Sequence, residues 1–93
     1  MAIFVKDPAV TIDYAVDWSA GYLTGQTITS SVWRVTPEGA GAIVVMGSAI
    51  GSGRTVVTLS GGRSGCLYHV TNQVGFSDSR TDERTLVLRV EDR

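Results

Sequence analysis

The chain has 93 residues, of which 43% are hydrophobic and 18% are charged. This length supports one domain with a single modest core, and the composition is that of an ordinary globular protein. Eight Lys and Arg residues against nine Asp and Glu residues give a formal net charge of -1, which argues against a groove that follows nucleic-acid phosphates. Apolar runs reach five residues at most, far below the roughly 20 that a membrane helix needs. We therefore expect one domain without nucleic-acid or membrane partners.

The first residues and the single cysteine limit the compartment and the chemistry. The segment before Val10 has only Lys6 as a basic residue and is interrupted by Asp7-Pro8, so we predict no secretory signal. Cys66 is the only cysteine, which excludes an internal disulfide framework and favours a small buried apolar residue. His69 is the only histidine and lies three residues away. On a strand this odd separation points the two side chains to opposite faces, so we expect neither a shared metal nor a catalytic pair, and no cofactor.

Residue types point to a mostly β protein. Val, Thr and Ile together supply 28 residues, and such β-branched side chains suit a pleated sheet better than a helix. The 11 glycines fall largely between these runs, where turns need positive φ. This punctuation recurs about every 8 to 14 residues, a spacing typical of short antiparallel strands in a sandwich or barrel.

Alternation places the strands. From Val10 to Trp18 the even positions are apolar, which predicts a half-buried strand. A competing pattern overlaps its end, because Asp17 could cap a single helical turn that closes at Gly25. Thr27 to Val35 is a second strand, in which a bulge near Ser30-Ser31 would reconcile Ile28 and Val32 on one parity with Trp33 and Val35 on the other.

The second half of the chain continues the pattern in two hairpins. We predict strands over Ala42–Ile50 and Arg54–Ser60 across Gly51-Ser52-Gly53, with Val57 and Leu59 inward. A further hairpin joins Cys66–Val74 to Arg84–Glu91 through a turn at Ser77-Asp78-Ser79. The inward residues of this hairpin are Cys66, Tyr68, Val70, Val74, Leu86, Leu88 and Val90.

Six strands, or seven if Ala2–Val5 adds an edge, predict an all-β immunoglobulin-like sandwich of two small antiparallel sheets. The segment from Gly65 to Val70 resembles the G-x-x-Y-x-V strand that carries the tyrosine corner of such domains. A small closed barrel is the alternative. By parity the larger aromatic residues belong to the core or the ends of the sandwich, although an exposed Trp18 or Tyr22 would be an interface anchor. These aromatic residues are Tyr14, Trp18, Tyr22, Trp33 and Tyr68.

Candidate chemical motifs do not assemble a catalytic site. The glycine-rich run from Gly47 to Thr55 lacks the lysine and the following helix of a phosphate loop. Asp13 and Asp17 lie about 13 Å apart on one strand face, beyond the separation that glycosidases use. Charged side chains at the base of the last hairpin suggest a local salt-bridge cluster or a polar contact patch for a partner. They are Arg80, Asp82, Glu83 and Arg84.

Three blocks of the chain resemble a family of small proteins of tailed bacteriophages and prophages, known as fiber-tail adaptor proteins. The blocks are DPAVTIDYAVDW with GYLTGQTI, LSGGRSGCLYHVTNQV, and SDSRTDERTLVLRV. The motif residues include Asp13, Tyr14, Asp17, Trp18, Gly61, Gly62, Gly65, Tyr68, Thr71 and Asn72. Family members often have glycine in place of Ser79 and threonine in place of Phe76, so the tip of the last hairpin departs from the pattern.

This resemblance implies an immunoglobulin-like virion component without catalytic activity or small-molecule substrate, made in the bacterial cytoplasm. It would act in many symmetric copies, and its partners would be other tail or fiber proteins. We expect the contacts to come from the 75–84 hairpin and the segment from Asp17 to Gly25. The candidate contact residues are Tyr22, Asp78, Arg80, Asp82 and Arg84. The alternative is a free-standing binding module, for example one that recognises carbohydrate through exposed aromatic side chains.

Overall fold

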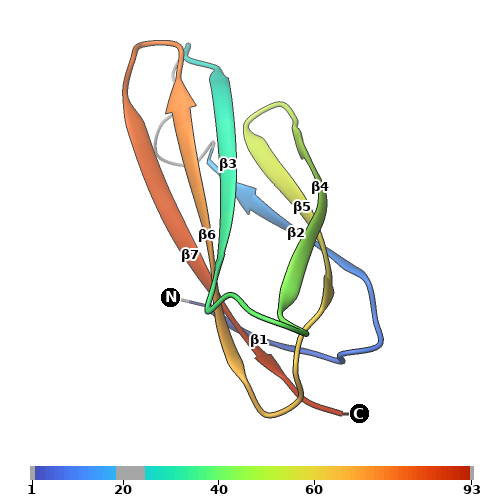
Figure 1. The fold of residues 1–93 in the computed structure, drawn as a ribbon. Helices are drawn as coiled ribbons and strands as arrows, with labels where there is room; N and C mark the ends of the chain where they lie inside the picture. Colours follow the sequence, from blue (N-terminus) through green and yellow to red (C-terminus); the bar gives the residue numbers. More distant parts are fainter. Residues whose placement is uncertain (1, 19–24, 93) are drawn as a thin grey trace.

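The computed structural model describes residues 2–18 and 25–92, which form seven strands and no helix. The strands are β1 (Ala2–Lys6), β2 (Ile12–Asp17), β3 (Ile28–Thr36), β4 (Ile43–Ile50), β5 (Arg54–Gly61), β6 (Leu67–Phe76) and β7 (Thr81–Val90). A four-stranded sheet in the order β1-β7-β6-β3 faces a three-stranded sheet in the order β2-β5-β4 (Figure 1). The all-β prediction is confirmed. The additional strand that was expected near the start of the chain is β1.

The strand order is compatible with an immunoglobulin-like sandwich. If the strands are lettered A to G along the chain, the sheets are B-E-D and A-G-F-C, and immunoglobulin domains divide strands B to G in the same way. One pairing differs from the prediction, because β1 runs parallel to β7, with Ala2 beside Leu86 and Lys6 beside Val90. The chain crosses from one sheet to the other between β1 and β2, so these two strands form no hairpin. The described strands form two separate sheets and not the alternative barrel.

Alternating side chains fill the space between the sheets. One cluster contains Ile43, Val57, Leu59, Tyr68, Val70, Leu88 and Val90. A second cluster toward the 77–80 turn contains Val16, Trp18, Val74 and Phe76, and Trp33 packs against both clusters. Each buried side chain of this size contributes about 1.5–3 kcal/mol of transfer free energy. The inward positions predicted for β5, β6 and β7 are confirmed, although Cys66 and Leu86 are only partly buried.

Two edge strands have register shifts in their pairing with the neighbouring strand. The pairing of β3 with β6 is irregular between Ile28 and Ser30, within one residue of the predicted bulge. This extra residue lets Ile28 and Trp33, an odd number of positions apart, pack against the same cluster. A second shift between Val45 and Gly47 in β4 was not predicted. Its sequence signal is the glycine inside a strand.

A buried lysine links the two sheets near the end of β1. Lys6 is 1% exposed, and its Nζ donates to the backbone carbonyls of Asp7 at 2.9 Å and Gly61 at 2.7 Å. Gly61 ends β5 in the opposite sheet, so the ammonium group connects the sheets through main-chain oxygens. Burial lowers the pKa of Lys6, while the nearby charge of Asp7 acts in the opposite direction.

Candidate interaction surface

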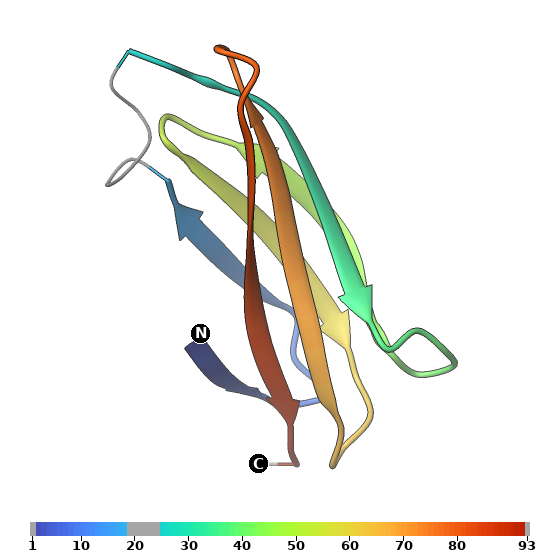
Figure 2. The same ribbon diagram turned by 90° about the vertical axis from the view of Figure 1, so that its left-hand side faces the viewer.

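The turn between β6 and β7 lies at one end of the elongated molecule, away from the C-terminal end (Figure 2). The Arg80 side chain is 75% exposed, and its Nε lies 3.4 Å from Asp78 Oδ2. Asp78 Oδ1 also accepts the backbone N–H of Arg80 at 3.1 Å. Ser79 has a φ of 71°, a conformation that favours glycine. This backbone geometry confirms the predicted turn.

The same turn is held against the residues that precede β3. The Ser77 N–H donates to the Thr27 carbonyl at 2.9 Å, and the Thr27 N–H donates to Ser77 Oγ at 3.0 Å. Gln26 Nε2 donates to Asp78 Oδ2 at 3.1 Å. These contacts join positions about fifty residues apart in sequence and fix the turn in place. A surface ordered in this way loses less conformational freedom when a partner binds.

The charged residues at the base of the last hairpin do not pair only with one another, as a local cluster would require. Glu83 Oε2 lies 3.0 Å from Arg34 Nη2 on β3, and both side chains are about half exposed. Arg80 pairs with Asp78, as described above. Asp82 Oδ1 accepts the Glu83 N–H at 2.8 Å. One of these exposed ion pairs therefore connects β7 to β3 and the other lies within the turn, and each contributes at most about 1 kcal/mol to stability.

Arg84 closes the end of the core over Trp18. Its guanidinium carbon lies 4.8 Å from the centroid of the Trp18 ring, and its Nη1 donates to the Asp17 carbonyl at 3.1 Å. Trp18 is 0% exposed and meets the Phe76 ring edge-on at 6.1 Å between centroids. Trp18 is therefore a core residue, as its parity predicted. Tyr22 and most of the helical turn predicted between Asp17 and Gly25 lie outside the described residues.

A buried chain of hydrogen bonds crosses the sandwich from Trp18. Trp18 Nε1 donates to Thr55 Oγ1 at 3.1 Å, and the Thr55 hydroxyl donates to Asn72 Oδ1 at 2.5 Å. Asn72 Nδ2 in turn donates to Ser31 Oγ at 2.9 Å and to the Val32 carbonyl at 3.2 Å. This series of hydrogen bonds therefore links two of the predicted motif residues, Trp18 and Asn72.

Thr55, which joins Trp18 to Asn72, was not among the predicted motif residues. Thr55 is 0% exposed. Its signal was a hydroxyl at an inward position, two residues before Val57 and four before Leu59. A buried polar group of this kind needs partners, because leaving it without them is costly.

The glycine and tyrosine motif positions are structural. Gly61, Gly62 and Gly65 all have positive φ, at 77°, 104° and 86°. Tyr68 is 2% exposed, and its hydroxyl oxygen accepts the backbone N–H of Arg63 at 3.1 Å. This bond to a backbone group five residues upstream has the form expected of a tyrosine corner.

Three further motif residues make contacts between strands, two within a sheet and one between the sheets. Thr58 Oγ1 donates to Asp13 Oδ1 at 2.5 Å between β5 and β2. Thr71 Oγ1 and Thr85 Oγ1 lie 3.0 Å apart between β6 and β7. The Tyr14 ring lies 5.3 Å from the Phe4 ring across the two sheets, and burial raises the pKa of Tyr14. The contacts of these motif residues therefore join strands of the sandwich.

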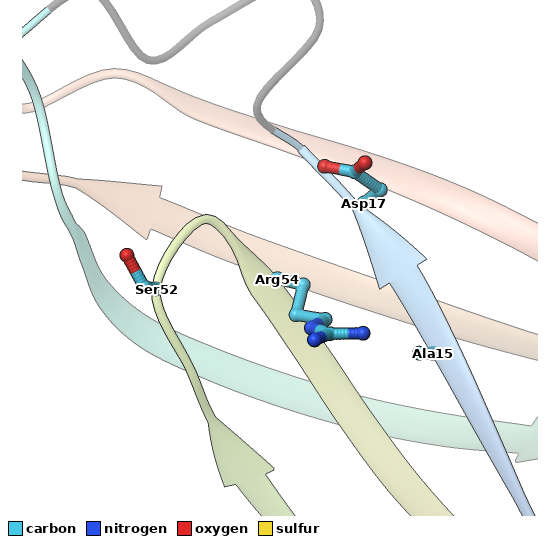
Figure 3. Close-up of a pocket in the computed structure, with 4 residues that line it drawn as sticks. All are labelled: Ala15, Asp17, Ser52 and Arg54. Carbon is cyan, nitrogen blue, oxygen red and sulfur yellow. The ribbon is translucent and has the colours of Figure 1, made fainter.

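A polar hollow of about 350 Å³ lies beside the end of β2, lined by Ala15, Asp17, Ser52 and Arg54. Asp17 and Arg54 are directly opposite in the register of β2 and β5. Figure 3 shows the Arg54 side chain lying toward β2, near Ala15. The described lining residues offer one guanidinium, one carboxylate and one hydroxyl. These groups can make polar contacts, but they do not provide a serine or cysteine nucleophile with a histidine base.

The single histidine and the single cysteine do not lie together. His69 is exposed on β6, whereas Cys66 packs beside the core cluster, so the predicted opposite orientations are confirmed. Among residues 2–18 and 25–92, no group of three His, Cys, Asp or Glu side chains could hold a metal ion. The same residues contain no helix that is long and apolar enough to cross a membrane.

Comparison with models of protein families shows which family the chain belongs to. A family model described as podophage GP4 fiber-tail adaptor protein gp77 matches residues 6–89. The chain belongs to this family. The resemblance seen in the three sequence blocks is therefore confirmed over nearly the whole chain, and membership of the gp77 family supports a structural role in a phage virion. No curated protein matches the chain.

Proposed function

We propose that this protein is a non-enzymatic part of a tailed-phage virion that connects tail and fiber proteins through protein–protein contacts. The observation that carries this proposal is the match of residues 6–89 to the fiber-tail adaptor family. The described side chains support it, because the motif residues make contacts between strands while Asp78 and Arg80 are exposed on the 77–80 turn. Such an arrangement suits a protein that acts through its surface.

The proposed contact surface is the end of the sandwich that contains the 77–80 turn. Asp78 and Arg80 are exposed there, and hydrogen bonds to Gln26 and Thr27 hold the turn in position. Tyr22 stays a predicted contact from the sequence. A contact made by a single turn binds weakly alone. Several copies around the tail axis would together give the affinity that stable attachment needs.

The virion role is tested by quantitative mass spectrometry of purified particles of the phage that encodes the chain. We expect the protein in mature particles at on the order of six or twelve copies, as cyclic symmetry around a tail would require. Absence from washed, infectious particles would contradict the proposal.

Charge reversal tests the contact surface separately. Arg80→Glu should reduce the retention of fiber proteins on the particle, because it changes the charge of an exposed side chain at the turn. Arg89→Glu is a matched control, since Arg89 is also an exposed arginine in an ion pair, with Glu91 at 2.8 Å, but it lies near the C-terminal end of β7, far from the turn. Equal fiber retention in both variants would reject the turn as the contact while leaving the virion role intact.

A further inference from the structure

The strand β4 is an edge strand that has a bulge but contains no charged residue and no proline. It ends the order β2-β5-β4, and no described strand pairs with its outer side. Edge strands present a row of backbone N–H and C=O groups that can pair with another strand, and proteins usually block them with charged residues or proline. The segment 39–53, which contains β4, has neither.

The other three edge strands of the described sheets each contain a charged residue. β1 has Lys6, β3 has Arg34, and β2 has Asp13 and Asp17. By contrast, β4 exposes apolar side chains, with Val44 53%, Met46 63% and Ile50 45% accessible. Met46 falls at the register shift between Val45 and Gly47. Figure 1 shows β4 beside β5 as an outer strand of the three-stranded sheet.

We propose that β4 pairs antiparallel with β4 of a second copy of this chain, so that two three-stranded sheets become one continuous sheet. The charges of the edge strands favour β4 of a second copy over β2 as the pairing strand. Pairing with β2 of another copy would place the apolar β4 side chains beside Asp13 and Asp17, whereas self-pairing sets apolar residues against apolar residues and opposes no like charges. A two-fold pair also satisfies the backbone groups of both edges with one interface.

The pairing goes beyond the proposed adaptor role, and its test needs only the purified full-length chain. Light scattering after size exclusion should give twice the chain mass of 9.9 kDa for the wild type at high micromolar concentration. Val44→Lys should weaken the dimer at least tenfold, because it places a charge among the apolar side chains of the paired edge. Val32→Lys is the matched control, since Val32 has the same exposed fraction of 53% on β3, and it should remain dimeric.

Self-crosslinking tests the symmetry of the pair even if a lysine variant unfolds. In a Cys66→Ser background, Met46→Cys should form a disulfide-linked dimer with itself on mild oxidation, whereas Val32→Cys should not. A monomeric wild type, or equal crosslinking of the two variants, would overturn the proposal. Pairing of β4 with a different protein would also overturn it, and would appear as a monomeric purified chain. Mass spectrometry of virions tests the adaptor role independently of these results.

Discussion

The guanidinium of Arg84 lies over the indole ring of Trp18 and joins the two sheets at the end of the core, 4.8 Å from the ring centroid. Arg84 belongs to β7 in the four-stranded sheet, and Trp18 directly follows β2 in the three-stranded sheet. The same side chain donates to the Asp17 carbonyl. Arg84 therefore combines a cation–π contact, a hydrogen bond and the packing of its alkyl stem.

Removal of this contact should lower stability. Arg84→Ala should reduce the free energy of unfolding by about 1 kcal/mol, since cation–π contacts contribute roughly 0.5–1 kcal/mol at surface sites. Arg84→Lys should recover only part of the loss, because an ammonium lacks the planar stacking surface. Urea unfolding followed by circular dichroism measures both changes. Arg89→Ala is the control, and an equal loss in that variant would show that the Trp18 contact has no special effect.

The buried hydroxyl of Thr55 should be required for the polar chain that crosses the core. Thr55→Val keeps the shape but leaves the Trp18 indole N–H and the Asn72 carbonyl oxygen without this partner, which should cost about 2–3 kcal/mol. Thr55→Ser keeps the hydroxyl and should be less destabilising. Denaturant unfolding compares the two variants, and a greater loss for serine would indicate that methyl packing dominates at this position.

The fit around Gly62 predicts a severe effect from a single methyl group. A Cβ at this position would lie 2.7 Å from Val90 Cγ2 and 3.0 Å from Ile43 Cγ1, and φ is +104°. Gly62→Ala should therefore destabilise the fold by about 1–3 kcal/mol through crowding and backbone strain. Gly65→Ala separates the two causes, because Gly65 also has positive φ but open space around it. Thermal unfolding should show a larger loss for Gly62→Ala, and equal losses would leave strain as the only cause.

The buried ammonium of Lys6 predicts a pH effect on the alkaline side. Burial lowers the pKa of Lys6 in the folded state below its ordinary 10.5, so the unfolded chain binds the proton more tightly. Stability from this group should rise as pH increases toward 10.5. The melting temperature of wild type minus that of Lys6→Met should therefore grow between about pH 8 and 10. Effects shared by both proteins, including the ionisation of Tyr14, cancel in this difference. A constant or shrinking difference would contradict the prediction.

Alternation along single strands predicted most of the core. Val57 and Leu59 lie inward on β5, and Tyr68, Val70 and Val74 lie inward on β6, because one face of each strand packs against the opposite sheet. The mismatch of parity between Ile28 and Trp33 also revealed a bulge. These features depend on residues near one another in sequence, where the period of two acts directly.

Features that join distant segments were not predictable in the same way. The parallel pairing of β1 with β7 depends on which sheet each strand enters, and residue types carry little information about that choice. The partners of Glu83, Arg84 and Thr55 lie on other strands, so the charge pattern at the hairpin suggested a local cluster instead. The motif residues were taken from the resemblance, and their contacts between strands are seen only in the structure.

The parallel arrangement of β1 and β7 determines how the protein would respond to mechanical load. The five paired positions from Ala2 to Lys6 lie side by side along the strand axis. If a force draws β1 backward and β7 forward, it acts along both strands and loads their hydrogen bonds together in shear. An antiparallel hairpin pulled open from its ends instead loses its bonds one after another. The first and last strands therefore form a clamp suited to a component that must stay folded while its attachments pull in opposite directions.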